Sequence, residues 1–243
     1  VFQRHIEHVF SNDVKHQARS LPVRVRDGVG GIPVAIFRMV RYLEDYGVEQ
    51  EGLFRKAGSV ARVRALRKLA DERQGNVDYF KEQGDASIAV DVATLLKQLM
   101  RDMPEPLFTR NLVEAFAAVE NVSHPEKQLQ LLKLLVLLLP PVNRRCVQYV
   151  FRFLKRVAAN SEKNLMTSTN LAVVFAPTFF YIRGAKGQQM LKEAQMQLQT
   201  AKVLKLLIER ADELGDLPPK MMAQIRSLND MAGKNKGGGK LSF

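Results

Sequence analysis

The sequence contains one cysteine and no tryptophan, and these shortages exclude several kinds of protein. Because Cys146 has no second cysteine to pair with, no internal disulfide can form. Together with the lack of a signal-peptide pattern, this predicts a reducing, cytoplasmic setting. No apolar run reaches the roughly 20 residues that a membrane span requires. The longest run starts at Leu131, contains Lys133 and stops at Pro140 and Pro141, which indicates a helix that lies deep in a core.

Patterns that bind metals or carry out catalysis are also scarce. His5, His8 and His16 lie close together in sequence, but no cysteines accompany them with zinc-finger spacing. We therefore expect solvent-exposed polar residues there and no metal site. The sequence has no Ser/His/Asp arrangement, no paired carboxylates and no GxxxxGK[ST] loop, so an enzyme with its own small-molecule substrate is the least favoured class.

The net charge of +12 and the pI near 9.9 predict a surface that attracts anions. Nucleic acid, anionic lipid and an acidic protein face would all fit this charge. Aromatic residues make up only 7% and do not alternate with basic ones, so a specific nucleic-acid groove is not favoured. A lysine-rich end, GKNKGGGKLSF, makes weak contact with an anionic membrane a further expectation.

The spacing of apolar residues predicts an all-α fold, a multi-helix bundle without strand patterns or internal repeats. Helix ends are marked by Thr167 or Ser168 as a cap and by Pro177 as a stop. We expect an N-terminal extension of uncertain structure (1–29), a helical domain (30–214) and a C-terminal linker with a basic flexible tail (215–243), in which 221–231 form a small amphipathic helix. Because Val1 replaces an initiator methionine, we expect an excerpt of a longer chain. The predicted helices cover residues 32–47, 59–75, 89–103, 111–122, 124–139, 143–159, 167–177 and 188–214.

The stretch EGLFRKAGS places Arg55 in a loop between two predicted helices. Gly52 and Gly58 allow backbone angles that other residues adopt only with strain, which favours a shaped loop over a helix interior. Ser59 stands at the expected N-cap of the following helix. An arginine in such a loop is either one of many surface cations or a side chain presented to a partner.

The stretch LLKQLMRDMPEPLF begins within the predicted helix 89–103, whose apolar stripe contains Val92 and Leu99, and continues past its end. At about 100° per residue, Lys97 and Arg101 fall on the far side of that stripe and within one turn of each other. Two cations at this spacing repel by a few tenths of a kcal/mol, so they do nothing for the helix itself. We expect both to point outward.

Together with MTSTNLAVVFAP, these two stretches occur in the order found in the RhoGAP domain, which the chain resembles over roughly residues 31–208. That family activates GTP hydrolysis by Rho-family small GTPases. The resemblance implies a helical bundle of the RhoGAP type, in agreement with the helices predicted independently. It also implies a cytoplasmic role, with which recruitment to a membrane or the cytoskeleton is compatible.

Carried over position by position, the resemblance implies that Arg55 is an arginine finger. Lys97 and Arg101 would belong to the GTPase-docking face, Asn170 would hydrogen-bond at or near that interface, and Pro106 would shape the same surface. Leu53 and Phe54 would be buried, which would hold the loop so that Arg55 projects. Asn170 alone would also fit a local role at a helix terminus.

The implied mechanism needs no cofactor of the chain's own, because the GTPase in its GTP-bound state would hold the nucleotide and magnesium. A planar, permanently charged guanidinium can bridge the oxygens that gain charge in phosphoryl transfer, where lysine cannot. A finger supplied in trans raises the rate of small GTPases by about 10³ to 10⁵. The alternative is a docking module of the same fold that binds small GTPases or other signalling proteins without accelerating hydrolysis.

The sequence departs from the family pattern in two places. Ala176 stands where many relatives have glycine, which is a small change if the backbone there is not left-handed. The FGxxL-like lead-in of the family is not found in VFSNDVKHQARSLPVRVRDG, near the start of the chain. Neither departure affects Arg55.

Overall fold

The computed structural model describes residues 31–84, 87–103, 105–180 and 188–215, and within 188–198 it describes the backbone alone. Every regular element in these ranges is helical and none is a strand, which confirms the predicted all-α fold. The elements are, in chain order, α3 (Val34–Tyr46), α4 (Val60–Glu72), α5 (Tyr79–Glu82), α6 (Ala89–Asp102), α7 (Val113–Ala118), η2 (Val119–Asn121), α8 (Pro125–Leu138), α9 (Pro141–Ala159), α10 (Ser161–Asn164), α11 (Ser168–Phe179), α12 (Gln188–Glu209) and η3 (Ala211–Glu213).

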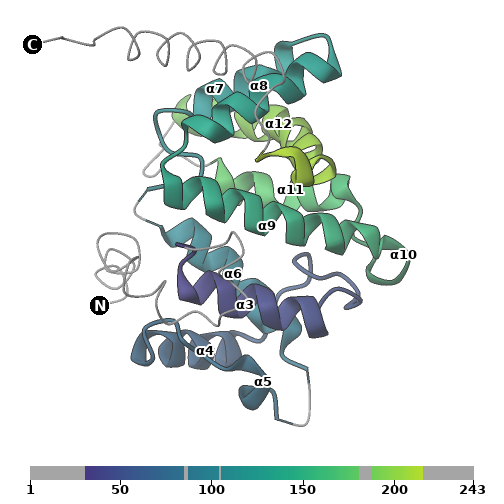
Figure 1. Cartoon of the computed structure of the whole chain (residues 1–243). Coiled ribbons are helices and arrows are strands. Elements are labelled where there is room, and N and C mark those ends of the chain that lie inside the picture. Colours follow the sequence, from purple (N-terminus) through teal and green to yellow (C-terminus); the bar gives the residue numbers. More distant parts are fainter. Residues whose placement is uncertain (1–30, 85–86, 104, 181–187, 216–243) are drawn as a thin grey trace, which may run out of the picture.

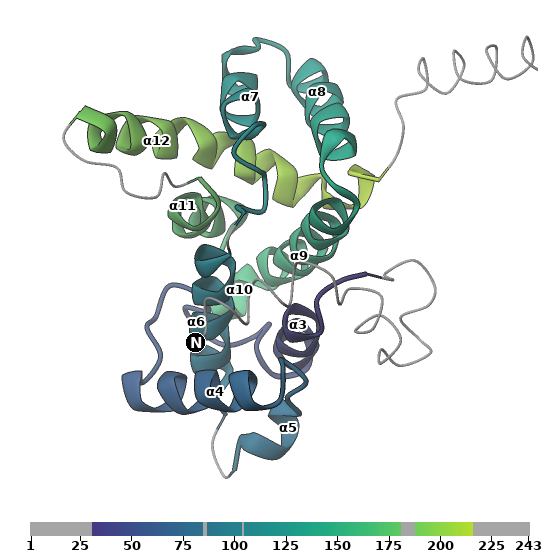
Figure 2. The same ribbon diagram turned by 90° about the vertical axis from the view of Figure 1, so that its left-hand side faces the viewer.

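The helices are arranged so that α7 and α8 lie at one end of the molecule and α4 and α5 at the other (Figures 1 and 2). Between these ends, α11 packs along α12, and α9 contacts both of them. Helix α6 contacts α3, α4 and α11. It therefore connects the two helices that flank the Arg55 loop with α11, which contains most of the MTSTNLAVVFAP motif.

The centre of the core is a cluster of phenylalanines from several helices. Phe108, in the loop after α6, packs against Phe116 of α7 with ring centroids 4.6 Å apart and against Phe180 at 5.1 Å. Phe151 of α9 and Phe179 of α11 extend the cluster, with centroids 5.5 Å apart. All five side chains are fully buried, and burying such rings is the main source of stability in a bundle of this kind.

Most predicted helices agree with the observed ones to within a few residues at each end. The periodicity does not predict α5 and α10, because each is only four residues long and shows no repeating pattern. The segment predicted as a helix at 221–231 lies outside the described residues, as do His5, His8 and His16. The predicted domain boundaries stay predictions.

Two expectations about helices are wrong. Pro177 does not end α11, which continues to Phe179, because the carbonyl of Ala176 still accepts a hydrogen bond from the Phe180 N–H at 2.9 Å. Helix α8 does not lie deep: Leu131 is 39% exposed and Leu138 is 68% exposed. This helix lies at an end of the bundle (Figure 1), and its buried residues, Leu129, Leu132 and Val136, fall on one face.

Candidate functional site

The loop between α3 and α4 buries its apolar residues and exposes its arginine. Gly52 has a φ of +69°, which is the left-handed conformation that glycine adopts most easily. Leu53 and Phe54 are 0% and 1% exposed, whereas Arg55 is exposed. The predicted burial of the two apolar residues is therefore confirmed, and Arg55 projects from a fixed base.

Phe54 is itself in a left-handed conformation, with a φ of 68°. Such a backbone is a strained outlier for a bulky residue and persists only where the surroundings hold it. Its ring packs against Phe175 of α11, with centroids 4.9 Å apart, and against Phe153 of α9 at 6.0 Å. These aromatic contacts stabilise the backbone turn immediately before Arg55.

The upstream end of the loop is held by Asn164, the last residue of α10. The Gly52 N–H donates to the Asn164 carbonyl at 2.8 Å. The Asn164 side chain is fully buried: its Nδ2 donates to the carbonyls of Val48 at 2.6 Å and Val157 at 2.7 Å, and its Oδ1 accepts from the Met166 N–H at 2.7 Å. This one amide thereby fixes α9, the start of the loop and the lead-in to α11 relative to one another.

The downstream end of the loop is held by Asp91 of α6, whose carboxylate is 1% exposed. It accepts hydrogen bonds from the Ser59 N–H and from Arg62 Nε, both at 2.7 Å. The Gly58 N–H donates to Thr94 Oγ1 at 3.0 Å. A Cβ atom at Gly58 would lie 2.6 Å from Asp91 Oδ1, so glycine is required for this close approach.

Ser59 precedes α4 as its N-cap residue, as predicted, but its side chain makes no capping hydrogen bond. The buried Asp91 carboxylate from the neighbouring helix binds the Ser59 backbone N–H instead. A carboxylate near the start of a helix is also favoured by the positive end of the helix dipole.

Lys97 does not point outward as predicted. It is half-buried, and its ammonium group donates to the carbonyl oxygen of Phe54 at 2.5 Å. Burial lowers the pKa of this ammonium group below its ordinary value. A long lysine side chain can turn its head group to the best available acceptor, which helical periodicity alone does not reveal. Arg101, one turn further along α6, is exposed as predicted.

Asn170 lies in the first turn of α11 and is exposed. Its Nδ2 donates to the Leu165 carbonyl at 3.0 Å, and its N–H donates to Thr167 Oγ1 at 3.2 Å. Thr167 is therefore the cap of this helix, one of the two predicted candidates. Val173, one turn further along α11, is 59% exposed.

The predicted site residues do not all lie at the surface. Arg55, Lys97 and Asn170 nevertheless belong to one connected region. Lys97 hydrogen-bonds to the residue before Arg55, and Asn164 hydrogen-bonds to the start of the same loop. Asn170 hydrogen-bonds to Leu165, which directly follows Asn164. Pro106, in contrast, is buried, and its carbonyl accepts from Asn143 Nδ2 of α9 at 3.3 Å. It supports the loop after α6 from the inside.

Arg55 is the side chain in this network best placed to act on a partner. Its guanidinium makes no hydrogen bond or ion pair with another residue of the described ranges, whereas the neighbouring Lys56 pairs with Glu51 at 2.9 Å. A free guanidinium can stabilise negative charge, but it supplies neither a nucleophile nor a general base. The arrangement suits a residue that completes a site on another molecule.

Metal-binding and membrane-spanning features are not found in the described part of the chain. No three His, Cys, Asp or Glu side chains there come together in a way that could hold a metal ion. None of its helices combines the length and hydrophobicity needed to cross a membrane. Ala176 lies within α11, and its φ is not positive, so the departure from glycine causes no strain.

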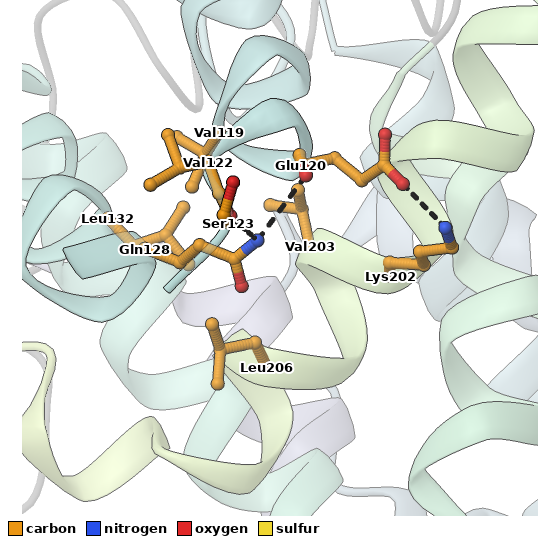
Figure 3. A pocket seen from close by; sticks show the side chains of 9 residues that line it. All are labelled: Val119, Glu120, Val122, Ser123, Gln128, Leu132, Lys202, Val203 and Leu206. Carbon is orange, nitrogen blue, oxygen red and sulfur yellow. Dashed lines mark hydrogen bonds and ion pairs between the residues drawn. The ribbon is translucent and has the colours of Figure 1, made fainter. Parts of the chain in front are cut away.

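A pocket lies between the loop before α8 and helix α12 (Figure 3). It has a volume of about 290 Å³ and an apolar floor that includes Leu132 and Val203. Its two charged side chains pair with each other, Lys202 with Glu120 at 2.5 Å, and Gln128 Nε2 donates to the Val122 carbonyl at 2.7 Å. The pocket therefore offers no unpaired charge to a ligand.

Comparison with known proteins agrees with this geometry. The model of the RhoGAP domain matches residues 33–184. The chain is 39% identical over 166 residues to Rho GTPase-activating protein 7 of Mus musculus, which covers 68% of this chain and 15% of that protein. It is 32% identical over 236 residues to Rho GTPase-activating protein 18 of Mus musculus, which covers 88% of this chain and 35% of that protein. The chain thus spans well under half the length of these curated relatives.

Solved structures are similar as well. The BH domain of Graf, the GTPase regulator associated with focal adhesion kinase, superposes with a TM-score of 0.64 at 25% identity, covering 76% of this chain and 95% of that one. Human Rho GTPase activating protein 15 shares the fold, with a TM-score of 0.65 at 21% identity, covering 84% of this chain and 90% of that one. Because the family model matches more than half of the 243 residues, the chain belongs to the RhoGAP domain family.

Proposed function

We propose that this chain is a GTPase-activating domain for Rho-family small GTPases and that it inserts Arg55 beside the GTP bound to its partner. The GTPase contributes the magnesium ion and the residue that positions the attacking water. Arg55 contributes a guanidinium that stabilises the charge developing on the transferred phosphoryl group and the leaving oxygen. Lys97, Arg101 and Asn170 contribute to the docking face.

The observation that carries the proposal is the way in which Arg55 is presented. The residue before it is fully buried in a strained conformation, and its carbonyl is bound by Lys97. The loop is attached to α10 on one side and to α6 on the other. A catalytic group that is positioned before the partner arrives loses less conformational entropy on binding.

Lys97 has two roles under this proposal. In the free chain it binds the Phe54 carbonyl and so holds the base of the finger. Its position beside Arg55 also adds positive charge where the nucleotide phosphates of the GTPase would approach. The predicted membrane contact through the lysine-rich tail concerns residues outside the described ranges and stays a prediction.

The proposal is tested by single-turnover GTP hydrolysis in a panel of Rho-, Rac- and Cdc-type GTPases, with and without the domain. We expect wild type to accelerate hydrolysis on at least one member. Arg55→Ala should lose at least about a hundredfold of that acceleration, roughly 2.7 kcal/mol, while its affinity for the GTPase stays within a few-fold. Arg152→Ala, which removes an exposed arginine of α9, is the matched control and should leave the rate unchanged.

Two results would contradict the proposal. Binding without acceleration on every GTPase of the panel would identify a docking module of the same fold. Acceleration that survives in Arg55→Ala would show that another group stabilises the transition state.

A further inference from the structure

Leu165 differs from the other left-handed residues of the described chain. The described non-glycine residues with positive φ are Phe54, Gln74, Thr109 and Leu165. Phe54 is held by aromatic packing in the core, and Gln74 and Thr109 are polar. Leu165 alone among these four is both apolar and substantially exposed, at 49%.

The local structure does not explain a leucine at this position. Leu165 ends α10 with φ 60° and ψ 24°, and its N–H donates to the Ser161 carbonyl at 3.0 Å, a common way to close a helix. Glycine or asparagine normally occupies such a position, because a side chain with a Cβ clashes there and only asparagine compensates through local hydrogen bonds. A half-exposed leucine therefore carries backbone strain without the burial that would offset it.

The position of Leu165 suggests what would cover it. Its carbonyl accepts the hydrogen bond of Asn170 Nδ2, and the preceding carbonyl, that of Asn164, holds Gly52 at the base of the Arg55 loop. Leu165 thus lies between Asn170, a residue of the proposed GTPase-binding face, and the base of the Arg55 loop. Residues with a strained backbone concentrate at functional and ligand-binding sites, where the strain is part of the function.

We propose that Leu165 is an apolar anchor that a hydrophobic patch on the bound GTPase covers, and that it sets the affinity for that partner. This inference rests on the proposed function. It assigns Leu165 a part in binding and none in the phosphoryl transfer itself. When the GTPase covers Leu165, apolar surface is removed from water, which favours binding. The interface would then combine this apolar contact with the charged contacts of the same face.

The test combines three variants with measurements of affinity, rate and stability. Leu165→Asn fits the left-handed backbone but removes the apolar group, whereas Leu165→Met keeps an apolar side chain. Leu138→Asn changes a 68% exposed leucine on α8, a helix at the opposite end of the molecule from α4 and α5, and serves as the control. The probe is the GTPase of the panel that wild type activates best, loaded with a non-hydrolysable GTP analogue for binding and with GTP for single turnover.

We expect Leu165→Asn to raise the Kd about tenfold, or about 1.4 kcal/mol. Its hydrolysis rate at saturating domain should stay within twofold of wild type, and its thermal midpoint should be no lower than that of wild type because the backbone strain is relieved. Leu165→Met should bind within about threefold of wild type, and Leu138→Asn should change neither affinity nor rate.

An unchanged Kd in Leu165→Asn would overturn the inference while leaving the proposed function intact, because Arg55→Ala would still lose its rate. A fall of several degrees in the thermal midpoint together with weaker binding would also overturn it, since Leu165 would then be a structural residue. If wild type neither binds nor activates any GTPase, the proposed function fails and the inference fails with it.

Discussion

The Arg55 loop and the pocket beside α12 both place charged groups next to apolar ones, but the positive charge is paired within the chain only at the pocket. At the pocket, Lys202 pairs with Glu120, so the positive charge is neutralised within the chain. At the loop, the buried polar groups of Asn164 and Asp91 bind backbone atoms, and the Arg55 guanidinium makes no hydrogen bond or ion pair in the described ranges. The exposed Glu51 carboxylate, whose pKa is lowered mainly by its hydrogen bond to Lys56, also interacts electrostatically with Arg55. The comparison shows that buried polar residues near the loop fix its shape and that the loop leaves the Arg55 guanidinium available to a partner molecule.

The largest effect on stability is expected from Asn164→Ala. The substitution leaves the Val48 carbonyl and the Met166 N–H without their partner in a buried region, and it removes one of two donors from the Val157 carbonyl. The free energy of unfolding should fall by about 3 kcal/mol, and the thermal midpoint by about 10 °C. Thermal unfolding measures this directly.

Asn160→Ala is the control for that experiment, because Asn160 Nδ2 makes a hydrogen bond at the exposed surface to the Arg156 carbonyl. It should cost less than about 1 kcal/mol. Equal losses in the two variants would show that Asn164 does not hold the loop region together. The loop would then be no more firmly fixed by buried polar groups than the pocket is.

A smaller effect is expected from Asp91→Ala. Removing the carboxylate leaves the Ser59 N–H without an acceptor and frees Arg62, which should lower the free energy of unfolding by about 2 kcal/mol. Under the proposed function it should also reduce the rate of GTP hydrolysis at saturating domain more than it weakens GTPase binding, because the loop is less fixed.

Chemical denaturation and single-turnover kinetics check both parts of this prediction. The exposed pair between Asp212 and Lys155 offers the control, since Asp212→Ala should change stability by no more than about 0.5 kcal/mol. If Asp91→Ala lost stability but kept the full hydrolysis rate, Asp91 would be a structural residue without influence on Arg55.

The lowered pKa of Lys97 predicts how the free energy of unfolding depends on pH. Because burial lowers its folded-state pKa below the ordinary value of 10.5, the unfolded chain binds more protons in the range between the two values. The stability of wild type should therefore rise with pH through that range relative to Lys97→Met, which cannot titrate. The measurement is the difference in unfolding free energy between the two proteins at pH 8 and near pH 10.5. A constant difference would mean that the pKa of Lys97 is not shifted by folding, and a difference that moves against wild type would mean that folding raises it; either would contradict the prediction.

The smallest effect is expected at the pocket, from Lys202→Ala. Its side chain is 75% exposed, and such surface pairs contribute about 0 to 1 kcal/mol. Stability should change by less than about 0.5 kcal/mol, and any GTPase activation should be unchanged. A clear loss of activation would mean that the pocket end takes part in function, which would break the comparison.

The fold could be predicted from the sequence where apolar residues repeat over several turns. Helices α3, α6 and α9 have strong one-sided patterns, and their limits agree closely with the prediction. The single turns α5 and α10 could not be predicted, because they depend on contacts with distant residues. The burial of α8 could not be predicted either, because a helix with leucines on every side does not reveal which sides the bundle covers.

The sequence indicated exposed candidates such as Arg55 and Asn170, but it did not indicate the residues that hold the loop in place. The glycines around Arg55 and the apolar pair before it pointed to a shaped loop. Asp91 carried a signal that could have been used, because a carboxylate inside the apolar run SIAVDVATLL needs a partner when the helix is buried. Asn164 carried no such signal, since Val48, the one partner of its side chain that is distant in sequence, is brought to it only by the fold.

The most direct test of the central claim is the single-turnover hydrolysis rate with Arg55→Lys at saturating domain. This variant keeps the positive charge but removes the planar, multi-donor group. We predict that it binds the GTPase within a few-fold of wild type and loses about a hundredfold of the acceleration, roughly 2.7 kcal/mol. Full acceleration with lysine at position 55 would contradict the account, because any positive charge at the tip of the loop would then be sufficient.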